Sequence, residues 1–239
     1  MRCASVARVR KMEQSAVAAG VPEYELMRRA GIRAAQWIKA RYPDAMRFVV
    51  LCGGGNNGGD ALVTAAHLLP YEIVVYSSRE PESFTGCAAS AMRDLPSEIP
   101  FFVRKKLDIF DLRPGDVVID GLLGIGFDSG ILRDDVYSYV STVNESRLPV
   151  IALDLPSGLD ANSGKKASNG VIKAELTLCF GVPKPGLFTA DGVEYSGVVR
   201  IIDIGLDENS ADGEEVFCNI DVVRNIFDFS QHRCGEKYF

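Results

Sequence analysis

Residues 49–60, VVLCGGGNNGGD, decide the fold of this chain. An apolar run breaks into glycines, and the apolar pattern resumes over residues 61–68, ALVTAAHL, with the period of a helix. This order predicts a buried strand, a tight turn and a helix, the first half of a βαβ unit. Glycines let the backbone approach a ligand, and the free N–H groups at a helix start carry partial positive charge. The stretch therefore predicts a site for an anion such as phosphate.

The polar residues of this stretch carry more information than its glycines. Residues 53–58 match the dinucleotide pattern G-x-G-x-x-G, but a glycine-dense loop meets that pattern easily. Asn56, Asn57 and Asp60 add amide and carboxylate oxygens, which suit a cation or a polar substrate. The alternative is that the two asparagines supply turn geometry and Asp60 caps the helix.

Composition narrows the class of protein. The chain has 239 residues, 47% of them hydrophobic, and a formal net charge of −6, which favours one α/β core that binds small molecules and not nucleic acid. No stretch approaches the roughly 20 apolar residues that cross a bilayer, so no membrane partner is expected. The six cysteines form no CxxC pair, which indicates reduced thiols in a cytosolic or organellar compartment and no zinc site.

The N-terminal segment admits two interpretations. Residues 1–12 are basic and rich in small side chains, as in a transit peptide. Their apolar spacing continues into predicted helices at 5–19 and 22–40, which keeps the segment within the fold. We therefore expect a cytoplasmic location, with a mitochondrial one as the alternative.

Two further strands are predicted to end in carboxylates. Residues 116–121 end at Asp120, and residues 149–154 end at Asp154, shortly before Ser157. Ligands of open α/β sheets bind beyond the carboxyl ends of the strands, so these oxygens are expected to meet Asn57 at one edge. The other predicted strands are 71–76, 101–103, 175–181 and 197–205, and the other helices are 87–95 and 134–146.

For two charged residues, the sequence is compatible either with binding a ligand or with a position on the surface. Glu80 falls near the spacing at which a dinucleotide enzyme places the acid that binds a ribose hydroxyl, or it is a solvated loop charge. Lys184 stands between two prolines that restrain it, and it either holds a phosphate or lies on the surface.

Three motifs together resemble a known family. NNGGD at 56–60, LDLPSGLD at 153–160 and FGVPKPG at 180–186 occur in the order found in the YjeF N-terminal domain family, the NAD(P)H-hydrate epimerases, and the resemblance runs from about residue 5 to 206. It implies a Rossmann-like three-layer α/β/α sandwich with a mostly parallel central sheet. It also implies an isomerase that interconverts the R and S forms of hydrated NADH and NADPH (NADHX and NADPHX), which are damaged cofactors.

The resemblance also implies the site. A potassium ion would be held by Asn57, Asp120 and Ser157, and this amide, carboxylate and hydroxyl suit a monovalent cation better than magnesium. The substrate-binding residues would be Asn56, Asn57, Gly58, Gly59, Asp60, Gly124, Ile125, Gly126, Phe127, Asp128, Ser129, Gly130 and Asp154. Because the hydroxyl on C6 of the ring must leave and return, a general acid is needed, and we expect Asp128 in this role with Asp154 as the second candidate.

Some positions depart from the family pattern. CGGG at 52–55 replaces a frequent Gly-Pro-Gly, Ala61 replaces a glycine, and Ile125 stands where threonine is common. These departures bear on turnover more than on binding. Two other functions therefore stay open: a non-catalytic nucleotide-binding or scaffold domain, and an ordinary NAD(P)-dependent dehydrogenase.

The expected domain organisation is an epimerase domain over residues 1–229 and a tail at 230–239. The tail resembles the start of a linker to a dehydratase that uses ADP or ATP, either fused or separate. We also expect a homodimer formed through the N-terminal helices.

Overall fold

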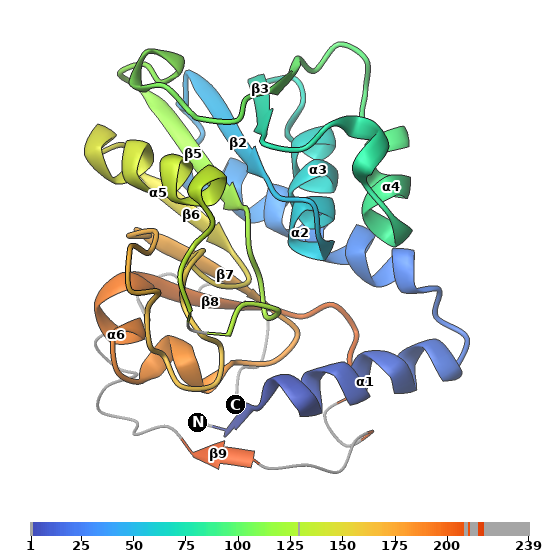
Figure 1. Ribbon diagram of the computed structural model, residues 1–239. Helices are drawn as coiled ribbons and strands as arrows, with labels where there is room; N and C mark the ends of the chain where they lie inside the picture. The colour runs from blue at the N-terminus through green and yellow to red at the C-terminus, as the bar shows by residue number, and fades with distance from the viewer. Residues whose placement is uncertain (1, 129, 208–209, 211–214, 218–239) are drawn as a thin grey trace.

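A seven-stranded parallel sheet forms the centre of the molecule (Figure 1). The computed structural model describes residues 2–128, 130–207, 210 and 215–217. The strand order is β4-β3-β2-β5-β6-β7-β8. The strands are β2 (Arg47–Cys52), β3 (Glu72–Ser77), β4 (Phe101–Val103), β5 (Asp116–Gly121), β6 (Val150–Leu153), β7 (Leu176–Phe180) and β8 (Val198–Ile202). Each predicted strand is confirmed, and no end differs by more than three residues.

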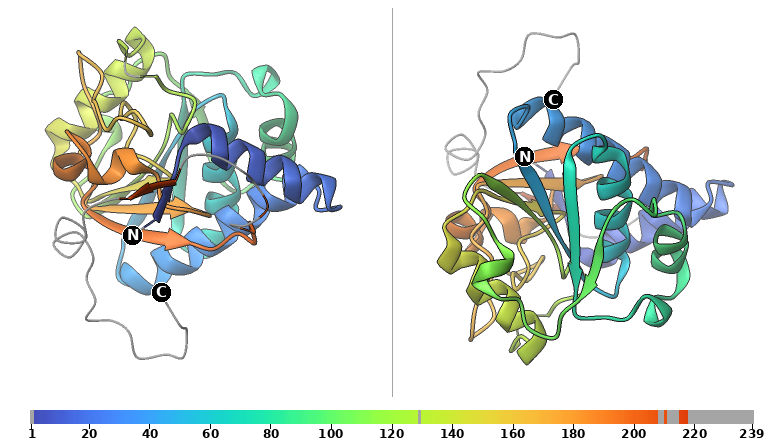
Figure 2. Two further views of the ribbon diagram at one scale, coloured as in Figure 1. Left: turned by 90° about the horizontal axis from the view of Figure 1, so that it is seen from below. Right: turned by 90° about the horizontal axis from the view of Figure 1, so that it is seen from above.

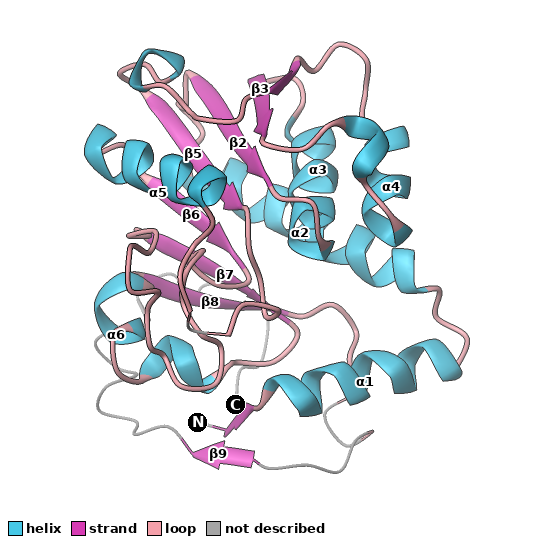
Figure 3. Ribbon diagram, in the orientation of Figure 1, coloured by secondary structure: helices cyan, strands magenta, loops and turns pink. Residues whose placement is uncertain are grey.

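Helices cover both faces of this sheet, as Figure 3 shows. α2 (Glu23–Arg41), α3 (Asn56–Leu68) and α4 (Gly86–Arg93) pack against one face, where Ile38 and Leu62 join Phe48 in the larger core. α5 (Asp134–Ser146) packs against the other face, where Tyr139 is fully buried beside Val118. The three-layer α/β/α sandwich is thus confirmed, and all seven strands are parallel.

The N-terminal segment belongs to the fold. β1 (Arg2–Ala4) pairs antiparallel with β9 (Glu215–Phe217), and α1 (Val6–Ala18) begins at the N-cap Ser5. Figures 1 and 2 show α1 lying across the carboxyl end of the sheet, apart from the other helices. Val9 and Met12 hold it there through a small core that includes Val182. Neither β1 nor β9 has the length or the alternation that would have predicted it.

Helix α3 starts earlier than the sequence pattern predicts. Its N-cap is Gly55, so the NNGGD motif forms the first turns of the helix and not the loop before it. Asp60 therefore lies inside α3, and the interpretation of Asp60 as its cap is wrong. A β-carbon on Gly58 would stand 1.8 Å from the carbonyl oxygen of Gly53, so only glycine lets α3 begin this close to the turn.

Short elements complete the chain. They are η1 (Pro81–Ser83), η2 (Ile109–Asp111), η3 (Pro185–Phe188) and α6 (Gly192–Tyr195). Cys52 and Cys179 are fully buried free thiols within strands, as expected for small apolar residues. Within the described residues, every helix is too short or too polar to cross a membrane. The tail at 230–239 lies outside the described residues.

The chain reverses direction across the sheet at β2. β2 lies between β3, which follows it in sequence, and β5, from which the chain continues to the opposite edge. A crevice forms at such a switch point, beyond the carboxyl ends of the strands. The first residues of the same two strands are joined by a buried ion pair between Arg47 and Asp116, with 2.6 Å between Nη2 and Oδ2. This ion pair therefore links β2 and β5 at the ends opposite the crevice.

Candidate functional site

A cavity of about 950 Å³ opens at the switch point, between α1 and the carboxyl ends of the strands. Its walls come from α1, the first turns of α2 and α3, and the segments that follow β2, β3, β5, β6 and β7. The described part of the chain thus brings these eight segments together at one cavity. Its volume is in the range of cavities that bind cofactor-sized molecules.

Asp154 and Lys184 form a buried ion pair in this cavity. The Nζ of Lys184 donates to the Oδ1 of Asp154 and to the carbonyl oxygen of Phe180, both at 2.6 Å. Burial lowers the pKa of Lys184, but the charges of Asp154 and Cys179 outweigh burial and raise it overall, so the ammonium stays charged. Asp154 adopts a left-handed backbone with φ of 64°, which is strained for a non-glycine residue and typical of functional sites. Lys184 therefore lies in the site and not on the surface.

Two further acids face this ion pair. Asp60, on α3, lines the cavity, and within the described residues its carboxylate has no hydrogen-bond or ion-pair partner. Burial, followed by the charges of Asp154 and Glu13, raises the pKa of Asp60 well above its ordinary value, against the opposing charge of Lys184. Burial is also the main reason that the pKa of Glu13, on α1, is raised. The cluster thus places a carboxyl group that binds its proton unusually tightly beside a fixed ion pair.

The residues predicted to hold potassium lie together. The hydroxyl of Ser157 donates to the Oδ1 of Asp120 at 2.6 Å, and the backbone N–H of Ser157 donates to Oδ2 at 2.8 Å. Leu123 links this pair to Asn57: its N–H donates to the Oγ of Ser157, and its carbonyl oxygen accepts from the Nδ2 of Asn57 at 2.7 Å. Asn57 lines the cavity, whereas Asp120 and Ser157 lie directly behind its wall.

Two features of this group suit a cation. The Oδ1 of Asn57 is buried and has no hydrogen-bond partner within the part of the chain that the structure describes. Asp120 is fully buried, and burial raises its pKa to about 6 despite its hydrogen bonds to Ser157 and Leu122. Buried polar atoms are nearly always paired, and a buried carboxylate needs a compensating charge. The donor set therefore fits a cation, although the described residues include no cluster of three His, Cys, Asp or Glu side chains that could hold a metal by themselves.

The other predicted binding residues fall into three groups. Those that line the cavity are Asn56, Gly124, Ile125, Gly126, Phe127 and Asp128. Gly58 and Gly59 are buried within α3 and do not line the cavity; a β-carbon on Gly59 would meet Met27 at 2.5 Å, so these glycines serve packing. Gly130 is exposed outside the cavity, and Ser129 lies outside the described residues. Asp128, the expected acid, is an exposed residue on the loop at the cavity.

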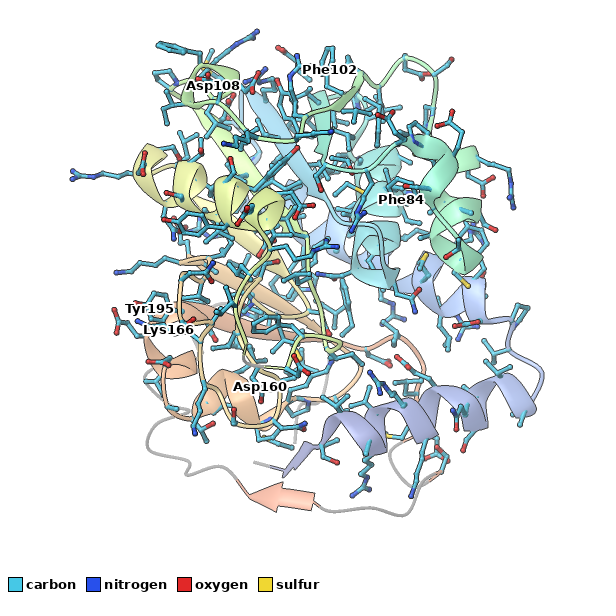
Figure 4. The ribbon with its side chains drawn as sticks, in the orientation of Figure 1. Phe84, Phe102, Asp108, Asp160, Lys166 and Tyr195 are labelled. Atoms are coloured by element: carbon cyan, nitrogen blue, oxygen red, sulfur yellow. The ribbon has the colours of Figure 1, made fainter. Side chains whose placement is uncertain are left out.

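Sequence reasoning missed the contributions of α1 and of the segment after β3. Glu13 and Arg10 line the cavity, but nothing in the sequence near the glycine turn indicates that α1 folds across it. Arg79 also lines the cavity, whereas the neighbouring Glu80 is exposed outside it. Asp160, the second acid of LDLPSGLD, accepts hydrogen bonds from Asn162 and Ser163 in its own turn, away from the cavity (Figure 4).

Comparison with known proteins bears directly on this site. The family model described as YjeF-related protein N-terminus matches residues 23–186. This range includes α3 and all three motifs, whereas α1 and β8 lie outside it. This chain belongs to the YjeF-related protein N-terminus family. The match covers well over half of the chain, so the resemblance drawn from the motifs is confirmed.

Individual relatives carry names that describe one reaction. The chain is 37% identical to the bifunctional NAD(P)H-hydrate repair enzyme Nnr of Coxiella burnetii over 206 residues. The aligned residues cover 84% of this chain and 41% of that protein. It is 34% identical to the NAD(P)H-hydrate epimerase of Clavibacter sepedonicus, over 87% of this chain and 92% of that protein. This chain therefore spans about two fifths of the bifunctional relative and nearly all of the shorter one.

A solved structure supports the fold. The crystal structure of yeast ynu0 matches with a TM-score of 0.70 and 23% identity, over 78% of this chain and 83% of that chain. At this identity the likeness bears on the fold alone.

Proposed function

We propose that this protein is an isomerase that interconverts the R and S forms of hydrated NADH and NADPH. The observation that carries the proposal is the cavity at the carboxyl ends of the strands. The NNGGD helix start, the Asp154–Lys184 ion pair and the Asp60 carboxyl group, which has no partner among the described residues, meet there. Membership of the family and the names of the Coxiella and Clavibacter relatives support the same reaction. The ordinary dehydrogenase is less well supported, because Glu80 lies outside the cavity.

We propose potassium as the resident cation. Asn57, Asp120 and Ser157 would hold it, and the unpaired Oδ1 of Asn57 together with the buried charge of Asp120 supports this assignment. A bound cation would supply positive charge beside the loop at Leu123, which links Asn57 to Ser157. The amide and hydroxyl oxygens suit a weakly hydrated monovalent ion better than magnesium, which demands an octahedral shell.

The reaction needs a proton donor at the C6 hydroxyl of the hydrated ring. Transfer of a proton to that hydroxyl breaks the C6–O bond, water leaves, and the lone pair on the ring nitrogen stabilises the resulting iminium ion. Water then adds to the opposite face of C6 and returns a proton to the protein, so atoms and charges balance. Ring opening and closure is the alternative route, and it requires the same proton transfers.

We propose Asp60 as this acid, in place of the Asp128 that the sequence suggested. Asp60 faces the cavity and has no hydrogen-bond or ion-pair partner among the described residues, and burial, followed by the charges of Asp154 and Glu13, raises its pKa, as suits a group that donates a proton. Asp154 is held by Lys184 and by the N–H of Phe180, which suits a fixed charge that positions the substrate. Asp128, in contrast, is exposed on its loop.

The test is conversion of purified R-hydrate to the S form, followed by chromatography. Wild type should reach the equilibrium mixture, and Asp60→Asn should slow it by about 10²- to 10⁴-fold, the usual contribution of a general acid. Asp128→Asn is the matched control and should retain most of the rate. If Asp60→Asn kept full activity and Asp128→Asn were slow, the general acid would be Asp128 and not Asp60. A folded wild type without activity would favour the scaffold alternative.

We propose further that the protein acts together with a dehydratase that uses ADP or ATP. The support is that the Coxiella relative is named bifunctional and that this chain spans only 41% of its length. The homodimer through the N-terminal helices and the cytoplasmic location stay predictions.

A further inference from the structure

Arg79 lies at one end of the cavity, on the segment that follows β3. Its side chain crosses the exposed Gly54: Cγ and Nε lie 3.3 and 3.6 Å from the place that a β-carbon on Gly54 would take. Gly54 directly precedes Gly55, the N-cap of α3. Among the described residues, the guanidinium of Arg79 has no hydrogen-bond or ion-pair partner; only its backbone N–H is bonded, to Ser77. A cation thus stands beside the start of α3 with its donors unused.

The acid on which the charge of Arg79 acts, Asp135, is already engaged. Asp135 accepts a hydrogen bond from Ser78 at 2.8 Å and forms an ion pair with Arg133 at 3.6 Å. Burial raises the pKa of Asp135, but the Ser78 hydrogen bond and the charges of Arg133 and Arg79 lower it overall. Among the described residues, the ion pair of Asp135 is thus with Arg133, and Asp135 leaves the guanidinium of Arg79 available to a ligand.

The opposite end of the cavity is acidic. Glu13, Asp60 and Asp154 gather there, from α1, α3 and the residue after β6, against the charges of Lys184 and Arg10. The sheet order separates the two ends, because β3 and β6 lie on opposite sides of the β2–β5 pair (Figure 1). An elongated ligand with a reactive ring at the acidic end, near the proposed acid, would run past the start of α3 and place its far end at Arg79.

We propose that Arg79 binds the 2′-phosphate of the adenosine ribose, and that this protein therefore prefers NADPHX to NADHX. The inference rests on the proposed function and specifies its substrate. The end of the second strand of a βαβ nucleotide unit is the place where the adenosine ribose is recognised, by an acid for a 2′-hydroxyl or by an arginine for a 2′-phosphate. Here the acid, Glu80, is outside the cavity and the arginine lines it.

The chemistry of the two groups matches. A phosphate monoester carries between one and two negative charges at pH 7, and a guanidinium binds its oxygens through parallel N–H donors. A free 2′-hydroxyl cannot use those donors in the same way. Removal of the Arg79 guanidinium should therefore weaken the binding of the 2′-phosphorylated hydrate and leave the binding of the other hydrate unchanged.

The experiment compares Arg79→Gln with wild type on both hydrates. The kcat/KM for NADPHX should fall about 10- to 100-fold, as expected for the loss of a charge-assisted hydrogen bond, while kcat/KM for NADHX should change less than about 2-fold. Arg93→Gln, an exposed arginine on α4 outside the cavity, is the matched control and should change neither. An equal loss with both hydrates, or no loss with either, would overturn the proposal.

A binding measurement separates this inference from the proposed function. Calorimetry should show that wild type binds adenosine 2′,5′-bisphosphate at least about 10-fold more tightly than adenosine 5′-monophosphate, a difference of one charge-assisted contact, and that Arg79→Gln removes this preference. This result without any epimerisation would refute the proposed function and keep the role of Arg79. Equal affinity of wild type for the two nucleotides, or binding of neither, would refute the role of Arg79.

Discussion

At the scale of single residues, the site contrasts two aspartates that lie close together. Asp154 is held by the Lys184 ammonium and a backbone N–H, whereas Asp60 meets no donor within the described residues. Neighbouring carboxyl groups can take different roles when their environments differ, and burial raises the pKa of Asp60. This contrast supports the proposed division of roles, in which Asp154 positions the substrate and Asp60 transfers the proton.

The Asp154–Lys184 pair should matter for stability as well. Asp154→Asn leaves the Lys184 ammonium buried without a counter-charge, so it should lower the free energy of unfolding by about 3–5 kcal/mol. Glu25→Gln breaks ion pairs that are largely exposed, and it should cost less than about 1 kcal/mol. Urea unfolding measures both. The double variant Asp154→Asn with Lys184→Met should regain part of the loss, and a cost of Asp154→Asn no larger than that of Glu25→Gln would contradict the account.

The raised pKa of Asp60 predicts how stability varies with pH. Because the folded state holds this proton more tightly than the unfolded chain, the carboxyl group lowers stability as pH rises from its ordinary pKa of 3.8 through the higher folded value. Asp60→Asn removes that dependence, so its stability relative to wild type should increase with pH. Thermal unfolding at pH 4 and pH 8 measures the difference. An unchanged or decreasing advantage of the variant across this range would show that the folded pKa is not raised.

Much of the site could be predicted from the sequence, because its polar residues follow recognisable strand ends. Asn57, Asp120 and Ser157 are brought together as expected, and Asp154 lines the cavity. The surroundings of Asp60 could not be predicted, because they depend on Glu13, which is distant in sequence and reaches the cavity only through tertiary packing.

At the scale of elements, the start of α3 decides how the site is built. Asparagine and glycine disfavour helix interiors, so their run predicts a turn, yet α3 begins at Asn56. The close fit of Gly58 against Gly53, and of Gly59 against Met27, overrides that preference. The strands and longer helices, in contrast, follow from apolar patterns that tertiary contacts reinforce.

The close contact of Gly58 can be tested directly. Gly58→Ala would place a β-carbon 1.8 Å from a carbonyl oxygen, so α3 must shift, at a cost of about 1–3 kcal/mol in stability together with loss of nucleotide binding. Gly126→Ala has open space and should change stability by less than about 1 kcal/mol. Urea unfolding and nucleotide calorimetry measure the two effects. Equal behaviour of these two variants would show that α3 does not depend on the missing side chain.

At the scale of the whole molecule, the sheet and α1 enclose one binding site from opposite sides. The switch point at β2 and β5 fixes the strand ends, and α1 closes the cavity above them (Figure 2). The strand order follows from general rules for parallel sheets, but the position of α1 depends on a small separate core around Met12 that no pattern indicates. The two-stranded β1–β9 sheet was missed for the same reason.

A resident potassium ion should stabilise the folded molecule as a whole. Raising potassium to about 100 times its dissociation constant should add about 2.7 kcal/mol to the free energy of unfolding. Asn57→Ala, which removes the unpaired buried oxygen, should abolish this response, whereas Asn56→Ala, its exposed neighbour, should retain it. Thermal shifts in potassium and lithium chloride at equal ionic strength measure the response. Identical shifts in the two salts would argue against a potassium site.

We propose that one cavity binds a hydrated nicotinamide nucleotide beside a monovalent cation and inverts its C6 centre. The most direct measurement is the rate at which a single purified epimer of NADPHX approaches the equilibrium mixture, with wild-type protein in potassium or lithium chloride. The account predicts a rate proportional to protein concentration in potassium and much slower conversion in lithium. A rate in potassium equal to that without protein, with the protein folded, would contradict it.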